Sequence, residues 1–419
     1  MTGKEDKRLE NARELIHNYE EKVIGKLFPE TNGKSIKEGT FSIERSLGNP
    51  SRIHYVVTDI ADGKNYTFSA RMYRATPKTY KGEISQAQKD YKSYLFLKER
   101  AGIEHAPRAV FLEEAPEWLF KEFIVGETLR DILDKDQEEK ARMKTLDEFL
   151  MPIVASIANY QSKATYAAQS LPVEERTKLL WSRSVEEQAK DYLTAYIGDK
   201  EEAADVAANL YIPLLGEALR GVSVCHGDLS PDNIIYNEEK KAFYFIDHEL
   251  KERNPFADLG CFIAYLGNYE GLWKKLAEKF KLIKTGLAMK EEGIKLTKLP
   301  IMAEPYKLEE KAKKDAHFEL YANILHHSLR RVSKYIQRGE KGYDGQIKNI
   351  EFILNSWTNS QADFNLAESD IEKINGLKKY FPGEKESNHA EAGQPGNQAQ
   401  AEVYINVRAG EAAQNRKIA

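Results

Sequence analysis

Two short apolar runs near the middle of the chain predict strands that flank a polar loop. Residues 222–224 and 243–246 are each too brief, and too rich in β-branched or aromatic residues, to favour a helix. Between them, Gly227 and Pro231 interrupt regular structure, and residues 234–236 resume an extended pattern. The pattern therefore predicts a loop whose polar side chains are presented at the mouth of a strand.

The N-terminal third of the chain contains several strand-like segments, and residues 68–73 show the two-residue alternation that is typical of a half-buried strand. Residues 83–101 instead repeat apolar positions on one face, as an amphipathic helix does. Further on, Gly126 ends an apolar run, and Thr128 is placed to cap the helix that follows. The predicted strands are 41–46, 53–58, 68–73 and 118–125.

Helical periodicity dominates most of the remainder. An amphipathic helix is predicted at 4–28, and its polar face mixes Glu with Lys, which favours packing on the protein over binding to a membrane surface. Pro152 is predicted to kink or delay a core helix at 146–160. Further helical patterns cover 185–220 and 306–380.

The C-terminal segment 384–419 changes composition to Gly, Ala, Gln, Asn and Glu. Such a segment cannot bury enough apolar surface to fold alone, so a flexible tail is predicted. Residues 403–407 form a β-prone island within it, for which an incidental cluster is favoured over addition to a sheet edge.

Charge and cysteine content exclude several classes of protein. With 62 Lys and Arg against 66 Asp and Glu, the 419-residue chain has a formal net charge of -4, so bulk charge indicates neither nucleic acid nor an anionic membrane as a partner. Its two cysteines indicate neither a disulfide framework nor a zinc site. The charged N-terminal segment lacks the apolar core of a signal peptide, and no run approaches the roughly 20 apolar residues of a membrane span. A soluble cytoplasmic protein is expected, and its oligomeric state is left open.

Polar residues in and after the predicted loop have the spacing that phosphoryl transfer from a nucleotide requires. Asp228 is the candidate base for the attacking hydroxyl, and Asn233 and Asp247 are candidate ligands of Mg²⁺. His226 is expected to hold the loop by hydrogen bonding. Asp, Asn, Gly and Pro are also ordinary turn formers, but a turn does not explain the whole set followed by a strand that ends in Ile-Asp-His-Glu.

The segment CHGDLSPDNIIY at 225–236 resembles the catalytic loop of the aminoglycoside phosphotransferase and choline kinase superfamily, the small-molecule branch of the protein-kinase-like fold. FIDHE resembles its metal-binding strand end, where an aromatic residue usually occupies the position of His248. NPFADLG at 254–260 resembles the segment whose aspartate supports the catalytic loop, which implies a structural role for Asp258.

The resemblance implies an α+β fold with two lobes, a small β-rich N-terminal lobe and a larger α-rich C-terminal lobe. The expected parts are an N-terminal amphipathic helix at 1–37, a nucleotide-binding lobe at 38–124, a catalytic and acceptor-binding lobe at 125–383 and a flexible tail at 384–419.

The strand FSARMY at 68–73 places Arg71 where kinase-like proteins carry their phosphate-binding cation. Aminoglycoside phosphotransferases usually have lysine there, whereas choline and ethanolamine kinases resemble this chain in having arginine before an apolar residue and tyrosine. Arginine keeps its charge and can grip two phosphate oxygens with its fork. The partner carboxylate is expected at Asp90, with Glu83 as the alternative, and a solvated helix charge explains either equally well.

Two weaker matches complete the expected nucleotide site. Gly48 and Ser51 are candidate phosphate donors in the turn after the first strand, although a simple hairpin turn explains the same residues. WLFKEFIVGETL at 118–129 resembles the connector between lobes, and Glu122 and Ile124 are expected to offer backbone groups to the adenine edge. No Walker-type glycine-lysine-serine loop is present.

The resemblance implies an enzyme that uses ATP and Mg²⁺ to phosphorylate a hydroxyl of a small molecule. An amino alcohol or an amino sugar is the expected acceptor, because the resemblance points there and carboxylates crowd the site. Glu249 is a candidate partner for a cationic group, and Tyr265 and Tyr269 are candidate ring faces for it. Surface charge or core packing is the plainer explanation of each.

Two alternatives remain at this stage. A protein Ser/Thr kinase shares the fold, but the metal site is followed by His-Glu in place of Phe-Gly, and no Ala-Pro-Glu segment comes after it. A pseudokinase scaffold that binds ATP is motivated by Arg71, Asp90 and the sparse loop around Gly48. The intact set of a base and two metal ligands argues against a scaffold.

Overall fold

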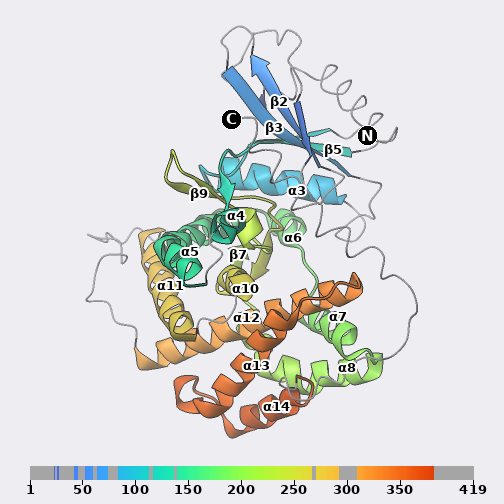
Figure 1. Cartoon of the computed structure of the whole chain (residues 1–419), viewed down its shortest axis with the longest axis vertical. Coiled ribbons are helices and arrows are strands. Elements are labelled where there is room, and N and C mark those ends of the chain that lie inside the picture. The colour runs from blue at the N-terminus through green and yellow to red at the C-terminus, as the bar shows by residue number, and fades with distance from the viewer. Residues whose placement is uncertain are drawn as a thin grey trace. The chain divides into compact units, whose positions relative to one another are not determined.

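A five-stranded antiparallel sheet and a larger helical body make up the computed structural model (Figure 1). The structure describes residues 42–45, 52–59, 64–73, 84–112, 117–135, 139–266, 270–291 and 309–381, together with the single positions 23, 26 and 27. All of these residues belong to one unit, Met1–Phe381. The predicted α+β class with two lobes is confirmed.

The N-terminal lobe is built on the sheet, whose strand order is β1-β2-β3-β5-β4. Each neighbouring pair is antiparallel, and Arg71 in β3 lies opposite Leu119 in β5. The four predicted strands of this lobe are confirmed as β1 Ser42–Arg45, β2 Arg52–Asp59, β3 Lys64–Tyr73 and β5 Glu117–Glu122, of which β5 ends three residues earlier than expected. Strand β4, Ala109–Leu112, was not predicted.

The predicted helix at 83–101 is shorter and changes its winding. Helix α3, Gln86–Leu95, starts at a capping box made by Ser85 and Gln88, and the chain then continues as one π-helical turn, η3 Phe96–Arg100. Helix α3 contacts β4 and β5, and Figure 1 shows it below the sheet. This contact brings Asp90 of α3 towards β3.

The predicted strands around the polar loop are confirmed. One small sheet has two strands, β7 (Ser223–Cys225) and β10 (Lys251–Arg253). A second small sheet has three strands, β6 (Glu127–Thr128), β8 (Ile234–Asn237) and β9 (Ala242–Phe245). Gly126 has φ 151°, and a Cβ there would collide with the carbonyl of Tyr236, so glycine lets the connector approach β8. Thr128 caps the next helix as predicted.

The C-terminal lobe is helical. The predicted helix at 146–160 is longer than expected, because α5 runs over Glu139–Gln169 and holds Pro152 in its interior. The other helices are α4 Leu129–Asp134, α6 Val173–Leu180, α7 Val185–Ile197, α8 Lys200–Val206, α9 Ile212–Leu219, α10 Ala257–Leu266, α11 Glu270–Glu291, α12 Glu310–Gln337, α13 Asp344–Asn359 and α14 Glu368–Lys378.

Helix α12 crosses α10 at a close contact that matters for the site. A Cβ on Gly260 of α10 would lie 2.6 Å from Cβ of Asn323, so only glycine permits this approach. Asn323 also donates to the carbonyl of Ala218 at 3.1 Å, which ties α12 to α9. The buried contact fixes α12 beside the loop that follows β7.

Several predictions fall on residues that the structure does not describe. These are most of the amphipathic helix at 4–28, Gly48, Ser51, Glu83, Tyr269, the tail at 384–419 and its island at 403–407. Of the predicted N-terminal helix, positions 23, 26 and 27 are helical, and Val23 and Leu27 are buried. Within the described ranges, no helix is long and apolar enough to cross a membrane.

Candidate active site

The loop after β7 is held in one shape by its own polar groups. Nε2–H of His226 donates to the carbonyl of Ile246 at 2.8 Å, and Nδ1 of His226 accepts from the backbone N–H of Asp228 at 3.3 Å. Nδ2 of Asn233 donates to the carbonyl of Asp228 at 2.8 Å. These contacts present the carboxylate of Asp228 and the amide oxygen of Asn233 together.

Asp258 lies beneath this loop at the start of α10. Its Oδ2 accepts from the backbone N–H of His226 at 2.8 Å and from Nε2 of Gln161 at 2.8 Å, while Oδ1 accepts from the backbone N–H of Gly227 at 3.0 Å. Gly227 has φ 86°, and a Cβ there would lie 2.7 Å from the carbonyl oxygen of Glu249. The loop therefore depends on a buried carboxylate below it and on glycine at its sharpest bend.

Asp247 follows β9 in an uncommon backbone conformation, with φ 58°. Its Oδ1 accepts from Nζ of Lys121, in β5, at 2.8 Å. The same ammonium donates to the hydroxyl of Tyr94 at 3.1 Å, and that hydroxyl accepts from the backbone N–H of Asp247 at 3.2 Å. A lysine of the N-terminal lobe thus holds the candidate metal-binding carboxylate.

His248 occupies the position where the resembled family usually has an aromatic residue, and its ring is packed as an aromatic would be. The ring lies parallel to Tyr160 with centroids 5.7 Å apart, edge-on to Tyr94 at 5.3 Å, and 4.7 Å from the ring of His226. Burial lowers the pKa of His248 well below its ordinary value. A neutral imidazole is therefore part of the packing under the loop.

Arg71 and Asp90 are brought together as predicted, although their contact is long. Nη1 of Arg71 lies 3.7 Å from Oδ2 of Asp90, whose two oxygens accept hydrogen bonds of 2.6 Å from Tyr73 and Gln86. Burial raises the pKa of Asp90 above its ordinary value, against the effects of Tyr73 and Arg71. The guanidinium of Arg71 also lies 4.6 Å from the ring centroid of Tyr73.

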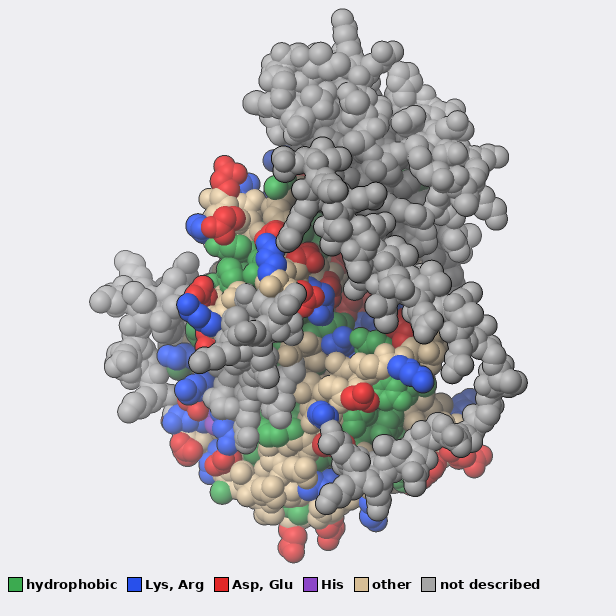
Figure 2. Space-filling model, viewed as in Figure 1, with side chains coloured by type: hydrophobic (Ala, Val, Ile, Leu, Met, Phe, Trp, Pro, Cys, Tyr) green, Lys and Arg blue, Asp and Glu red, His purple; other side chains and the backbone are tan. Residues whose placement is uncertain are grey.

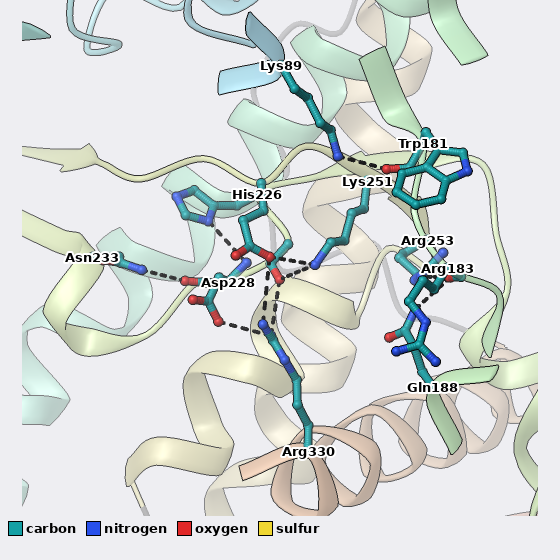
Figure 3. Close-up of polar contacts among 12 residues, drawn as sticks. Lys89, Trp181, Arg183, Gln188, His226, Asp228, Asn233, Lys251, Arg253 and Arg330 are labelled. Atoms are coloured by element: carbon teal, nitrogen blue, oxygen red, sulfur yellow. Dashed lines mark hydrogen bonds and ion pairs between the residues drawn. The ribbon is translucent and has the colours of Figure 1, made fainter. Parts of the chain in front are cut away.

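Arg330 reaches the loop from α12 (Figure 3). Its Nη1 lies 3.0 Å from Oδ1 of Asp228 and 3.3 Å from the carbonyl of Gly227, and its Nη2 lies 3.7 Å from Glu249. Burial opposes the charge of this guanidinium, but Asp228 and Glu249 outweigh burial and raise its pKa above the ordinary value. One arginine thus neutralises part of both carboxylates.

Glu249 and Tyr265, the described candidates for binding a cationic acceptor, already contact cations of the chain. Burial opposes ionisation of Glu249, but Lys251, which donates to it at 2.7 Å, and Arg330 outweigh burial and lower its pKa to about 2. The guanidinium of Arg331 lies 3.5 Å from the ring centroid of Tyr265. Both groups are therefore engaged within the chain.

Glu122 and Ile124, the residues expected to contact adenine, do not line the cavity that holds most of the other predicted site residues. The backbone N–H of Glu122 donates to the carbonyl of Arg108 at 3.0 Å, so in this conformation it is not offered to a nucleotide. The side chain of Ile124 packs with Ile235 and Tyr244 in a small apolar cluster between the connector and β8 and β9. This pairing next to β4 uses the N–H of Glu122, and the expectation that backbone groups of Glu122 and Ile124 meet adenine stays a prediction.

A second contact between the lobes runs from α3 to the segment after α6. Nζ of Lys89 donates to the carbonyl of Trp181 at 2.8 Å, as Figure 3 shows. Burial, followed by the nearby charge of Lys251, lowers the pKa of Lys89 to about 8. The ammonium is thus partly desolvated at the edge of the site.

A cavity of about 760 Å³ brings most of the predicted site residues together. Figure 2 shows acidic and basic side chains close together in the hollowed middle of the face that it views. The cavity is lined by nine Lys and Arg side chains and by five Asp and Glu side chains. The predicted residues that line it are Arg71, Asp90, Asp228, Asn233, Asp247, Glu249 and Tyr265.

Lys121 and Arg330 line the cavity but were not predicted from the sequence. Lys121 stands two residues after Leu119 in β5, and both line the cavity, so strand alternation was a usable signal. Arg330 lies far along the chain from Asp228, and it reaches the loop because α12 packs on α10. No local pattern in the sequence reports that contact.

The oxygens of the loop fit a divalent cation that is shared with a ligand. Nδ2 of Asn233 is turned to the carbonyl of Asp228, and Oδ1 of Asn233 accepts from no described residue. Across the described ranges, no three His, Cys, Asp or Glu side chains gather as a metal site. Mg²⁺ is commonly held by one or two protein oxygens together with phosphate and water, and Oδ1 of Asn233 and the carboxylate of Asp247 would supply such protein oxygens.

Comparison with known proteins shows the fold. No family model and no curated protein matches the chain. A choline kinase from Cryptosporidium parvum is similar over 88% of this chain and 99% of its own length, with 13% identity and a TM-score of 0.54. An ethanolamine kinase from Plasmodium vivax covers 82% of this chain and 93% of its own, with 12% identity and a TM-score of 0.46. The chain therefore has the two-lobed fold of a choline kinase structure, and the predicted resemblance is confirmed at the level of the fold.

Proposed function

We propose that the chain is a phosphotransferase that transfers the γ-phosphoryl group of ATP to a hydroxyl of a small molecule. The observation that carries the proposal is the meeting of Asp228, Asn233 and Asp247 in one cavity with cations from the N-terminal lobe. That set supplies a base, oxygen ligands for Mg²⁺ and positive charge for phosphates, which are the parts that phosphoryl transfer needs.

Asp228 is the proposed base. It accepts the proton of the acceptor hydroxyl as the bond between that oxygen and the γ-phosphorus forms, and the bond from the γ-phosphorus to the bridging oxygen of ADP breaks. Arg330 holds the carboxylate from α12, and the loop contacts of His226 and Asp258 fix its position. In this proposal, His226 and Asp258 act through the loop and do not touch the reacting atoms.

Asn233, through Oδ1, and Asp247 are the proposed ligands of Mg²⁺. When bound, Mg²⁺ neutralises charge on the phosphates during transfer. Arg71 and Lys121 are the proposed cations for the nonreacting phosphates, with Asp90 holding Arg71. Lys121 donates to Asp247 at 2.8 Å, so one side chain contacts the proposed metal ligand and is also proposed to bind the phosphates.

The remaining parts of the nucleotide site stay predictions. Gly48 and Ser51 are proposed to cover the phosphates, and the backbone near Ile124 is proposed to meet adenine. The lobes are proposed to be 38–124 for the nucleotide and 125–383 for catalysis and the acceptor, after an N-terminal helix at 1–37 and before a tail at 384–419. An amino alcohol or an amino sugar is the acceptor class that the resemblance predicts.

The proposal is tested by measuring nucleotide binding and ADP release with the full chain. Titration with ATP is expected to show binding that is strengthened by Mg²⁺, and ADP release is expected to rise with a small acceptor from a panel of choline, ethanolamine, sugars and aminoglycosides. Absence of nucleotide binding would contradict the kinase function. Phosphate transfer to a generic protein in preference to every small acceptor would favour the protein kinase alternative, and ATP binding without any transfer would favour the scaffold.

A further inference from the structure

A row of cations on α12 lines the cavity beside the candidate base. Arg330 and Lys334 are four residues apart on one face of the helix, Arg338 follows four residues later as its C-cap, and Arg331 lies next to Arg330. All four line the cavity. This cationic row, Arg330, Arg331, Lys334 and Arg338, lies on the C-terminal lobe.

The carboxylates of the site neutralise only part of this row, in which Arg338 lies 3.9 Å from Glu340. Arg330 is paired with Asp228 and Glu249, and Glu249 is also bonded to Lys251. Among the residues that the structure describes, no carboxylate lies within ion-pair distance of Lys334. Burial and the charge of Arg330 lower the pKa of Lys334, which is the shift that an anionic ligand would reverse.

The two described residues that were predicted to bind a cationic acceptor, Glu249 and Tyr265, already contact cations of the chain. Arg331 covers a ring face of Tyr265 at 3.5 Å, so that face is closed to a quaternary ammonium group. Glu249 has two cations of the chain as neighbours. An ammonium group placed here would meet more positive than negative charge.

The phosphates of the nucleotide have other partners in the proposed function. Arg71 and Lys121 project from β3 and β5 of the N-terminal lobe, whereas the cationic row projects from α12. In Figure 3, Arg330 reaches Asp228 from below, and Lys89 enters from above. The row is therefore left for the other substrate.

We propose that the acceptor is an anionic small molecule whose phosphate or carboxylate group binds Arg331 and Lys334, while its hydroxyl lies at Asp228. This inference rests on the proposed phosphotransferase function and deepens it by naming the class of acceptor. The acceptor oxygen gains the phosphoryl group, its proton passes to Asp228, and ADP leaves, as in the proposed function. The anionic group takes no part in bond making.

Binding to the full chain tests the inference. The chain is first saturated with Mg²⁺ and a non-hydrolysable ATP analogue, and inorganic phosphate, glucose 6-phosphate, glucuronate, glucose, glucosamine and choline are then titrated calorimetrically. The anionic probes are expected to bind more tightly than glucose, and glucosamine and choline more weakly. The comparison of glucose 6-phosphate with glucuronate separates a phosphate group from a carboxylate.

Variants of Lys334 link the binding to the cationic row. Lys334→Gln is expected to weaken binding of the anionic probe by about tenfold or more, since a hydrogen bond to a charged group is lost. Lys334→Arg is expected to retain most of the affinity. Lys311→Gln serves as the matched control, because Lys311 is an exposed lysine of the same helix that does not line the cavity.

The inference is overturned if no anionic probe binds, if glucosamine or choline binds more tightly than the anions, or if Lys334→Gln binds anions as the native chain does. Its failure is distinct from failure of the kinase function. If the nucleotide binds and only cationic acceptors release ADP, the kinase function stands and the anionic acceptor is wrong. If anions bind through Lys334 and ATP does not bind, the anion site stands and the kinase function is wrong.

Discussion

Nη1 of Arg330 lies 3.0 Å from the carboxylate of Asp228, and this contact joins α12 to the loop after β7. The same guanidinium reaches the carbonyl of Gly227 and the carboxylate of Glu249. A single arginine therefore fixes the candidate base and balances its charge. Arg330 is also the first residue of the cationic row, so the row begins at the candidate base Asp228.

Replacement of Arg330 is expected to destabilise the fold. Arg330→Gln removes the cation that pairs with Asp228 and one of the two cations beside Glu249. The free energy of unfolding is expected to fall by about 2 kcal/mol, with allowance for the partial exposure of the carboxylates. Arg338→Gln is the control, because its side chain is 65% exposed and its contact with Glu340 is 3.9 Å long. Denaturant unfolding measures both, and equal losses in the two variants would contradict the role given to Arg330.

Asp258 is expected to be needed for the loop. Asp258→Asn replaces one acceptor oxygen with an N–H donor facing backbone N–H groups, so the free energy of unfolding is expected to fall by about 2 kcal/mol. Asp232→Asn, on the same loop but half exposed and paired with Arg130, is expected to change it by less than about 1 kcal/mol. Chemical denaturation compares the two, and a smaller effect at Asp258 than at Asp232 would be incompatible with the hydrogen bonds described.

Lys121 is expected to affect nucleotide binding more than stability. Lys121→Met removes a cation from the cavity and a partner of Asp247, and binding of Mg-ATP is expected to weaken by about tenfold. Lys98→Met is a suitable control, because Lys98 bonds the carbonyls of Glu104 and Ala106 and does not line the cavity. Unchanged nucleotide affinity in Lys121→Met, measured calorimetrically, would remove Lys121 from the site.

Glu249 is expected to contribute to stability in a manner that depends on pH. Its pKa is lowered from 4.5 to about 2 in the folded chain, so its contribution is full above the ordinary value and is lost as pH falls through about 2. The difference in free energy of unfolding between the native chain and Glu249→Gln is therefore expected to be largest at neutral pH and to shrink between about 4.5 and about 2. Urea unfolding at a series of pH values measures it, and a constant difference would show that the ion pairs of Glu249 contribute nothing.

The elements around the loop could be predicted from the sequence because those features are local, whereas the fold class was implied by the resemblance of the loop to a known superfamily. Turn formers between two β-rich runs predicted β7, β8 and β9, and the strand FSARMY predicted β3. The exchange of an aromatic for His248 was visible in the sequence. Its packing against Tyr160 was not, because that contact joins distant segments.

The net charge around the residues proposed to bind the acceptor could not be predicted from the sequence, because it depends on tertiary contacts. Glu249 and Tyr265 are suitable for binding a cation when each is considered alone. The structure places Lys251 and Arg330 on the first and Arg331 on the second. Helical periodicity marks 306–380 as helix, but it does not report which face of α12 meets the loop.

The most direct test of the account is the rate of phosphoryl transfer from Mg-ATP in Asp228→Asn, measured as ADP release with the best acceptor of the panel. Transfer is expected to fall by about 10² to 10⁴-fold, the contribution typical of a general base, while nucleotide affinity stays close to that of the native chain. Transfer at the native rate in Asp228→Asn would contradict the assignment of Asp228 as the base.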